Sequence, residues 1–302
     1  MKDTVISVEN LTKDYGNDRG IFDVSLDIRE GEVFGYLGTN GSGKTTTIRH
    51  MMGFLKADSG RVTINGLNPW VSAPDVMKSV SYIPGEIAFP DLKTGTDFFR
   101  VQAQYLGVED FTYMNHLIDM LGLDPSAGLK RMSKGMKQKT AIVAALMGDR
   151  QILILDEPTT GLDPLMRETF LDLIREEKSK GRTVFMSSHI FEEIEDVCDR
   201  VAIINNGRIQ SVLSMSDFRH NSVRRFTVEF SDEASAKLFR ERVTPSERDG
   251  LTVEFEAAVN GIDAAFKSMN GLKVESLSEG HPNLEDYFMK TIRNEIPKEA
   301  SR

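Results

Sequence analysis

The segment GTNGSGKT at residues 38–45 offers the clearest chemistry in this sequence. It fits the pattern G-x-x-x-x-G-K-[ST] and lies between a strand-like run, EVFGYL, and a segment with helical spacing. Glycines let the backbone wrap closely, so that N–H groups and a helix amino terminus face phosphate oxygens. Lys44 adds a cation, and the Thr45 hydroxyl can ligate Mg²⁺. The predicted nucleoside triphosphate site comprises Gly38, Thr39, Asn40, Gly41, Ser42, Gly43, Lys44, Thr45 and Thr46.

A pair of carboxylates, Asp156 and Glu157, follows the apolar run ILIL at residues 152–155. At the tip of a buried strand, Asp156 can hold Mg²⁺ through water, and Glu157 can orient and deprotonate a water molecule that attacks the γ-phosphate. Alone, such a pair is equally consistent with a solvated turn. Combined with the phosphate loop, it predicts nucleotide hydrolysis.

These residues need a scaffold of strands and helices, and the hydrophobic pattern indicates one. Short apolar runs such as 31–37 and 152–155 alternate with periodic segments such as 165–174, which is typical of an α/β domain with parallel strands. The run at 152–155 has no polar face, which places it at the centre of the sheet. Between residues 89 and 148 only helical spacing is found, so we expect a helical insertion there.

A new pattern begins after residue 214. Strand-like RRFTVEF, LTVEF and LKVESL alternate with helix-like segments, and the last helix carries Leu284, Tyr287 and Phe288 on one face. The sequence therefore predicts a domain at 1–214 and a small α+β domain at 215–302.

Composition limits the classes of function. The 302 residues include 37 basic and 46 acidic side chains, a net charge of -9, whereas a duplex-binding protein usually shows a basic surplus. The single cysteine, Cys198, cannot form an internal disulfide, and we expect it to be a small buried apolar residue. The longest apolar run, 141–147, is far shorter than the roughly 20 residues that cross a bilayer. We therefore expect a cytoplasmic protein without nucleic acid as partner.

With the phosphate loop and the acidic strand end in place, the sequence resembles the ATP-binding subunits of ABC transporters over about residues 4–213. Between the two motifs lies RMSKGMKQK, which matches the family signature Leu-Ser-Gly-Gly-Gln at Ser133 and Gly135. The other signature positions differ, a loosened form that resembles exporters. Ser133 would open a helix whose amino terminus faces the γ-phosphate bound by a second subunit. A simple helix cap explains Ser133 equally well in isolation.

Three further matches follow from this resemblance. TTGLD at 159–163 looks like the family's D-loop, with Asp163 at the dimer seam. MSSHI at 186–190 places His189 as the switch histidine, with a catalytic role beside Glu157. Tyr15 resembles the aromatic residue that stacks on adenine, although an ordinary surface tyrosine is the alternative.

One family residue is missing. Where the family has a glutamine that links Mg²⁺ and the attacking water to the helical subdomain, this chain reads SYIPGEIAF, with Gly85 at that position. Coupling would then run through water, through the backbone or through the neighbouring Glu86.

The resemblance implies an ABC cassette of the P-loop NTPase class that uses ATP and Mg²⁺. It implies an ATPase that dimerises with a second ATP-binding subunit, either an identical chain or a close paralogue, and drives a separate membrane permease. Such a subunit would lie at the cytoplasmic face of the membrane, and the terminal LEDYF, which resembles exporters of drugs, antimicrobial peptides or lipids, favours export. The alternative is a soluble ABC ATPase with a regulatory or nucleic-acid-linked role.

Overall fold

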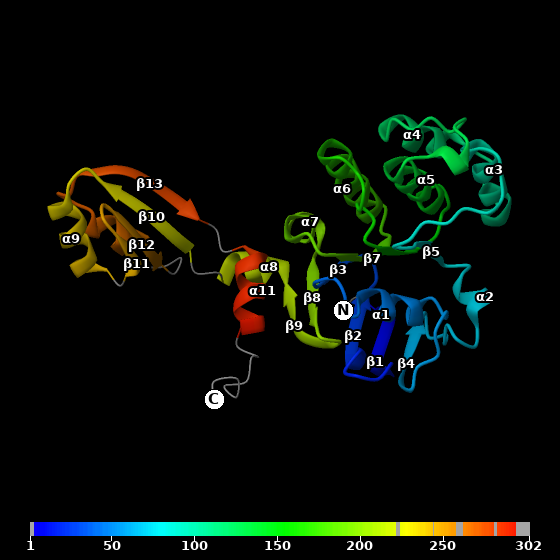
Figure 1. The fold of residues 1–302 in the computed structure, drawn as a ribbon, viewed down its shortest axis with the longest axis horizontal. Coiled ribbons are helices and arrows are strands. Elements are labelled where there is room, and N and C mark those ends of the chain that lie inside the picture. Colours follow the sequence, from blue (N-terminus) through cyan, green and yellow to red (C-terminus); the bar gives the residue numbers. More distant parts are fainter. Residues whose placement is uncertain (1–2, 222–223, 244, 258–261, 281–282, 294–302) are drawn as a thin grey trace. The chain divides into compact units, whose positions relative to one another are not determined.

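In the computed structural model the chain divides into two compact units, Met1–Leu213 and Ser214–Arg302. The structure describes residues 3–221, 224–243, 245–257, 262–280 and 283–293. Figure 1 shows the elements of each unit in the order of the chain. The first unit has the expected α/β class, and the second is an α+β domain.

A six-stranded sheet forms the middle of the first unit, with strand order β5-β6-β7-β3-β8-β9. Its strands are β3 Val33–Leu37, β5 Val80–Ile83, β6 Ile152–Asp156, β7 Thr183–Ser188, β8 Arg200–Asn205 and β9 Arg208–Ser214. All recorded pairings among β5, β6, β7, β3 and β8 are parallel. The prediction that β6 lies at the centre was wrong. It is buried throughout and paired on both sides, but it lies second from the β5 edge because β3 and β7 take the middle.

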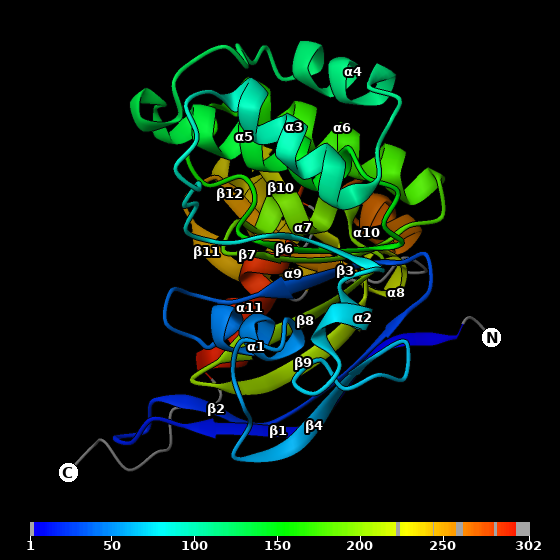
Figure 2. The ribbon, with the colours of Figure 1, turned by 90° about the vertical axis from the view of Figure 1, so that its right-hand side faces the viewer.

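A separate antiparallel sheet of three strands, in the order β2-β1-β4, precedes and flanks the phosphate loop. Its strands are β1 Thr4–Asp14, β2 Gly20–Arg29 and β4 Ser59–Ile64. Helix α1, Lys44–Met51, lies between the two sheets, and its Ile48 and Met51 are buried in a core to which both sheets contribute (Figure 2). The hydrophobic pattern does not separate this sheet from the parallel one, because the period of two is the same in both.

Helices cover the opposite face of the parallel sheet (Figure 2). The segment 89–148, predicted to be helical, contains α3 Gly95–Leu106, α4 Thr112–Met120, the 3₁₀ helix η1 Leu129–Arg131 and α5 Lys134–Leu146. A capping box between Thr94 and Asp97 begins α3, and Gly107 in the left-handed conformation ends it. This segment is the helical insertion of the first unit.

The remaining helices of the first unit connect the strands. They are α2 Ala73–Val76, α6 Pro164–Ser179 and α7 Phe191–Val197. Helix α6 packs on β7, and α7 packs on β3 and β7. Cys198 follows α7 and is buried, as predicted. Within the described part of the chain, none of the helices is both long and apolar enough to cross a membrane.

The second unit contains a four-stranded antiparallel sheet in the order β11-β12-β10-β13. Its elements are α8 Met215–Asn221, β10 Arg224–Phe230, α9 Glu233–Arg242, β11 Pro245–Asp249, β12 Thr252–Ala257, α10 Ile262–Ser268, β13 Val274–Gly280 and α11 Leu284–Arg293. The sequence pattern misses β11, because PSERD has no apolar residue and pairs only with β12 at the edge of the sheet.

The second unit has a core of its own, made largely of phenylalanine rings. The buried rings of Phe226, Phe230, Phe239 and Phe255 contact one another: Phe226 stacks on Phe255, whereas Phe239 meets Phe230 at a tilt and Phe255 edge-on. Removing one ring from so small a core leaves a cavity that neighbours can fill only in part.

Phe239→Ala should therefore destabilise the second unit by about 3–5 kcal/mol. The neighbouring Leu238 is half-exposed. As a matched control, Leu238→Ala should lower the free energy of unfolding by less than about 1 kcal/mol. Hydrogen exchange followed by mass spectrometry should show faster exchange in β10 and β12 of Phe239→Ala and unchanged exchange in β3 and β6. Equal acceleration in both units would show that they unfold as one.

Candidate active site

The phosphate loop connects β3 to α1, and its glycines are required by close contacts. Gly43 has a φ of 111°, and a Cβ built there would lie 2.6 Å from the side chain of Ile21. At Gly38 a Cβ would lie 2.5 Å from the carbonyl oxygen of Ile204. Any larger side chain would displace the neighbouring strands. The loop is therefore held close to the sheet, with the amino terminus of α1 facing the space above it.

Lys44 lies at the centre of this loop and is almost fully buried. Its Nζ donates hydrogen bonds to the carbonyl oxygens of Gly38 at 2.7 Å and Thr39 at 3.1 Å. The same nitrogen lies 3.2 Å from Oε1 of Glu157. The phosphate-loop lysine and the acidic residue after β6 are thus in direct contact.

Asp156 and Glu157 occupy the carboxyl end of β6, and Ser187 of β7 joins them. The Ser187 hydroxyl donates to Oδ1 of Asp156 at 2.7 Å and accepts from the backbone N–H of Glu157 at 3.0 Å. Asp156 is fully buried, and its Oδ2 has no hydrogen-bond partner. Glu157 has a left-handed φ of 48°, uncommon for a residue with a side chain. A buried carboxylate oxygen left without a donor is the kind of atom that a cation or its water satisfies.

His189 follows β7 and reaches the same carboxylate from the other side. Its Nδ1 lies 3.3 Å from Oε2 of Glu157. The segment before it is held by Ser188, whose hydroxyl donates to Oε2 of buried Glu193 at 2.8 Å and accepts from the N–H of Ile190 at 2.9 Å. Burial raises the pKa of Glu193, and Arg167, 3.3 Å away, opposes this. Sequence reasoning missed Ser187, Ser188 and Glu193; the signal was the pair of serines before His189.

A cavity of about 460 Å³ opens above the phosphate loop. Its lining combines the loop and Glu157 with residues from the β1–β2 connection and from the turn after β8: Tyr15, Asp18, Arg19, Gly20, Asn40, Gly41, Gly43, Lys44, Thr45, Thr46, Glu157, Asn206 and Gly207. Tyr15 is half-exposed at this cavity, where a flat base can stack on its ring. Sequence reasoning did not identify Asp18, Arg19 or Asn206, which come near the loop only through the fold.

The signature and D-loop residues lie together, away from this lining. Ser133 caps α5 by accepting from the N–H of Met136 at 3.2 Å, and Asp163 caps α6 by accepting from that of Met166 at 3.0 Å. A Cβ at Gly135 would lie 3.0 Å from the carbonyl oxygen of Gly161, so the two loops touch. Among the described residues that line the cavity, neither loop is represented.

Gly85 lies directly against Asp156. A Cβ built at Gly85 would be 3.2 Å from the unpartnered Oδ2, tighter than most such contacts. A side chain at this position would therefore meet the carboxylate of Asp156 directly. Burial, together with the negative charge of Asp156, raises the pKa of nearby Tyr82 to about 12. Glu86, the proposed substitute, is exposed.

Comparison with known proteins gives consistent matches. A family model described as ABC transporter matches residues 21–160. The bacitracin transport ATP-binding protein of Bacillus licheniformis is 29% identical over 96% of this chain and 97% of its own length. An uncharacterized ABC transporter ATP-binding protein of Bacillus subtilis is 32% identical over 96% of each chain. The linearmycin resistance ATP-binding protein of the same organism is 30% identical over 96% of this chain and all of its own.

Solved structures agree with these matches. The ATP-binding subunit of an ABC transporter is 31% identical, with a TM-score of 0.64, and the match covers 72% of this chain and 92% of that one. A bacterial Atm1-family ABC exporter with ATP bound has the same fold, with a TM-score of 0.62 at 20% identity, over 72% of this chain and 40% of that one.

The contact at Gly85 makes a prediction about hydrolysis. Gly85→Ala should lower the rate of ATP hydrolysis about fivefold, the effect of about 1 kcal/mol of crowding against Asp156. Gly85→Gln should lower the hydrolysis rate less than Gly85→Ala does, because the glutamine amide can donate a hydrogen bond to Oδ2 of Asp156. Glu86→Ala, as the exposed neighbour, should keep the wild-type rate. Steady-state kinetics at several Mg²⁺ concentrations measure all three; a wild-type rate for Gly85→Ala would mean that Asp156 tolerates the added methyl group.

Proposed function

We propose a mechanism from the premise that this chain belongs to the ABC transporter ATP-binding proteins, as its full-length relatives show. The chain is an ATP-hydrolysing subunit of a transporter, and its partner is a membrane permease. The comparisons support this function over a soluble regulatory or nucleic-acid-linked ATPase. The observation that carries the mechanism is the meeting of Lys44, Glu157 and His189 at one edge of the sheet.

ATP binds along the cavity above the phosphate loop. The loop amides and the amino terminus of α1 hold the phosphate oxygens, and Lys44 neutralises the outer phosphates. Tyr15 stacks on adenine at the open end of the cavity. Lys44, whose Nζ contacts Glu157 before the nucleotide binds, would then share its charge between that carboxylate and the phosphate oxygens.

The residues present also fit a Mg²⁺ ion. Thr45 offers a hydroxyl at the start of α1, and the buried Oδ2 of Asp156 lacks a partner. Bound there, Mg²⁺ would neutralise charge that develops on the β- and γ-phosphates. Ser187 fixes the other carboxylate oxygen of Asp156.

Glu157 acts as the general base. It orients a water molecule in line with the γ-phosphorus and takes its proton, while the bond from that phosphorus to the β–γ bridging oxygen breaks and leaves ADP and phosphate. His189 and Lys44 approach opposite oxygens of the carboxylate and hold it in place. The left-handed backbone at Glu157 aims the side chain at the cavity rather than back along β6.

The signature residues act on a second subunit. Ser133, Gly135 and Asp163 lie together outside the lining of this chain's own cavity. This position supports a role in completing the ATP site of a partner, in a dimer of two identical or closely related ATP-binding subunits. The dimer would lie at the cytoplasmic face of the membrane, held there by the permease.

The direction of transport follows from the full-length relatives. Their printed names refer to bacitracin transport and linearmycin resistance, and the similarity extends over the second unit as well as the first. We assign this chain to export, with antimicrobial compounds as the substrate class. The permease makes the substrate contacts, so the chain should be expressed together with its permease. Cells that carry both should be more resistant to such compounds. Loss of this resistance with Glu157→Gln would show that it depends on ATP hydrolysis.

Glu157→Gln should reduce ATP turnover by about 10² or more, because an amide cannot take the proton. ATP binding should stay intact, and the variant should accumulate as an ATP-bound dimer that light scattering detects. Glu192→Gln, an exposed glutamate of α7, serves as the matched control and should behave as wild type. Normal turnover by Glu157→Gln would remove Glu157 from the role of base.

A further inference from the structure

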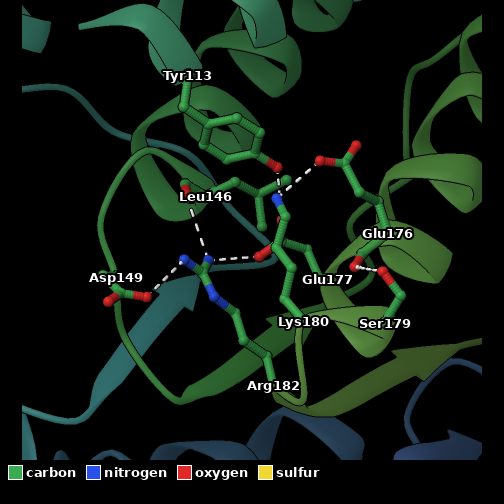
Figure 3. Close-up of polar contacts among 8 residues, drawn as sticks. All are labelled: Tyr113, Leu146, Asp149, Glu176, Glu177, Ser179, Lys180 and Arg182. Atoms are coloured by element: carbon green, nitrogen blue, oxygen red, sulfur yellow. Dashed lines mark hydrogen bonds and ion pairs between the residues drawn. The ribbon is translucent and has the colours of Figure 1, made fainter. Parts of the chain in front are cut away.

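A buried polar cluster lies outside the nucleotide cavity, where the helical insertion meets the rest of the first unit (Figure 3). It draws on the ends of several elements and the loops between them: Tyr113 of α4, Leu146 at the end of α5, Asp149 in the loop that follows, Glu177 of α6, Lys180 just after α6, and Arg182 just before β7. None of these residues touches the cavity, and the ATPase chemistry does not use them.

Glu177 is the centre of the cluster and is fully buried. It accepts hydrogen bonds from the Tyr113 hydroxyl at 2.5 Å and from Lys180 Nζ at 2.9 Å, and it is paired with Arg182. A buried carboxylate is costly unless such partners are in place, and removing one partner costs more than an exposed pair would. The position of each donor is therefore strongly specified.

Tyr113 connects the helical insertion to Glu177. Besides its hydrogen bond, its ring lies beneath Lys180, whose Nζ is 3.8 Å from the ring centroid. Burial and the bond to Glu177 raise the pKa of Tyr113, so its hydroxyl remains a donor. Burial opposes the charge on Lys180, but hydrogen bonds to Glu176, Tyr113 and Glu177 outweigh it and raise the pKa.

Arg182 ties the end of α5 to the same point. It donates to the carbonyl oxygen of Leu146 at 3.4 Å and pairs with Asp149 at 3.2 Å. At the start of α5, the side chain of Gln138 donates to the carbonyl oxygen of Pro158 at 2.6 Å. The insertion is thus attached to the sheet-bearing part of the unit at both ends of α5.

The opposite ends of these elements carry the residues of the ATP site. Ser133 is the N-cap residue of α5, Asp163 is that of α6, and β7 leads to His189. At 1.5 Å per residue, α5 spans about 20 Å. If the contacts around Glu177 were lost, the carboxyl end of α5 would be free to shift. The helix could then rotate slightly about the Gln138 contact, and this rotation would move Ser133 relative to Asp163.

We propose that Tyr113 and Glu177 are positioning residues that fix the orientation of the helical insertion and so place Ser133 for the second subunit. This inference rests on the proposed function, because it requires Ser133 to complete a partner's ATP site. The proposed role predicts different effects on ATP affinity and on dimer closure. ATP affinity depends on the cavity and is unaffected, whereas dimer closure and turnover depend on the cluster.

The test uses Tyr113→Phe, which removes one hydroxyl and keeps the ring, and Glu177→Gln as a second variant. In the Glu157→Gln background, Tyr113→Phe should weaken the ATP-dependent dimer by about 3- to 30-fold, the range for coupling through such a network. With Glu157 present, kcat should fall by a similar factor, while the Kd for ATP stays within about twofold. All measurements are made on the full chain, well below the Tm of each variant.

Matched controls come from the same helices or the same insertion. Tyr105→Phe changes an exposed tyrosine of α3, and Asp172→Asn changes an exposed carboxylate of α6. Both should keep the wild-type dimer affinity and kcat. If Tyr113→Phe lowers the Tm but leaves dimer affinity and kcat unchanged, the cluster is structural only and the proposal is overturned. If Glu157→Gln alone forms no dimer, the dimer model fails, and an unchanged kcat for Tyr113→Phe would then overturn the positioning role independently.

Discussion

The parallel pairing of β3, β7 and β6 is the constraint on which the rest of the site depends. Its register aligns Leu37 with Ser188 and Asp156 with Ser187, so the three strands end together. Each end then continues into a different functional segment: the phosphate loop after β3, the acidic pair at β6 and the histidine after β7. The contacts of Glu157 with a lysine and a histidine far apart in the chain follow from that register.

A second level of organisation joins this edge to the helical insertion. The loops at the amino termini of α5 and α6, where the signature and D-loop residues lie, touch each other, and Arg182 joins their carboxyl ends by bonding Leu146 and Glu177. In the proposed dimer the first contact would face the partner subunit, whereas the second surrounds the fully buried Glu177. A buried carboxylate far from the nucleotide can therefore influence closure, because the helices between the two points are stiff.

Local motifs made part of this structure predictable. The phosphate loop needs adjacent glycines and a lysine, and the acidic pair needs a preceding apolar run, so each can be recognised within about ten residues. Ser187, Glu193 and the Tyr113–Glu177 cluster could not be found in this way, because their partners are brought together by tertiary structure. Strand β11 was not predicted because an edge strand needs no apolar residues. The contact between Gly85 and Asp156 was not predicted because only the fold brings the two residues together.

In the proposed dimer, each ATP site combines Lys44 of one subunit with Ser133 of another. Mixing two full-length variants, Lys44→Ala and Ser133→Arg, tests it most directly by ATPase rate. Each variant alone should be inactive, whereas the mixture should recover about a quarter of the wild-type rate, because half of the dimers would then contain one intact site. Full activity of Ser133→Arg alone, or no recovery on mixing, would contradict a site shared between two subunits.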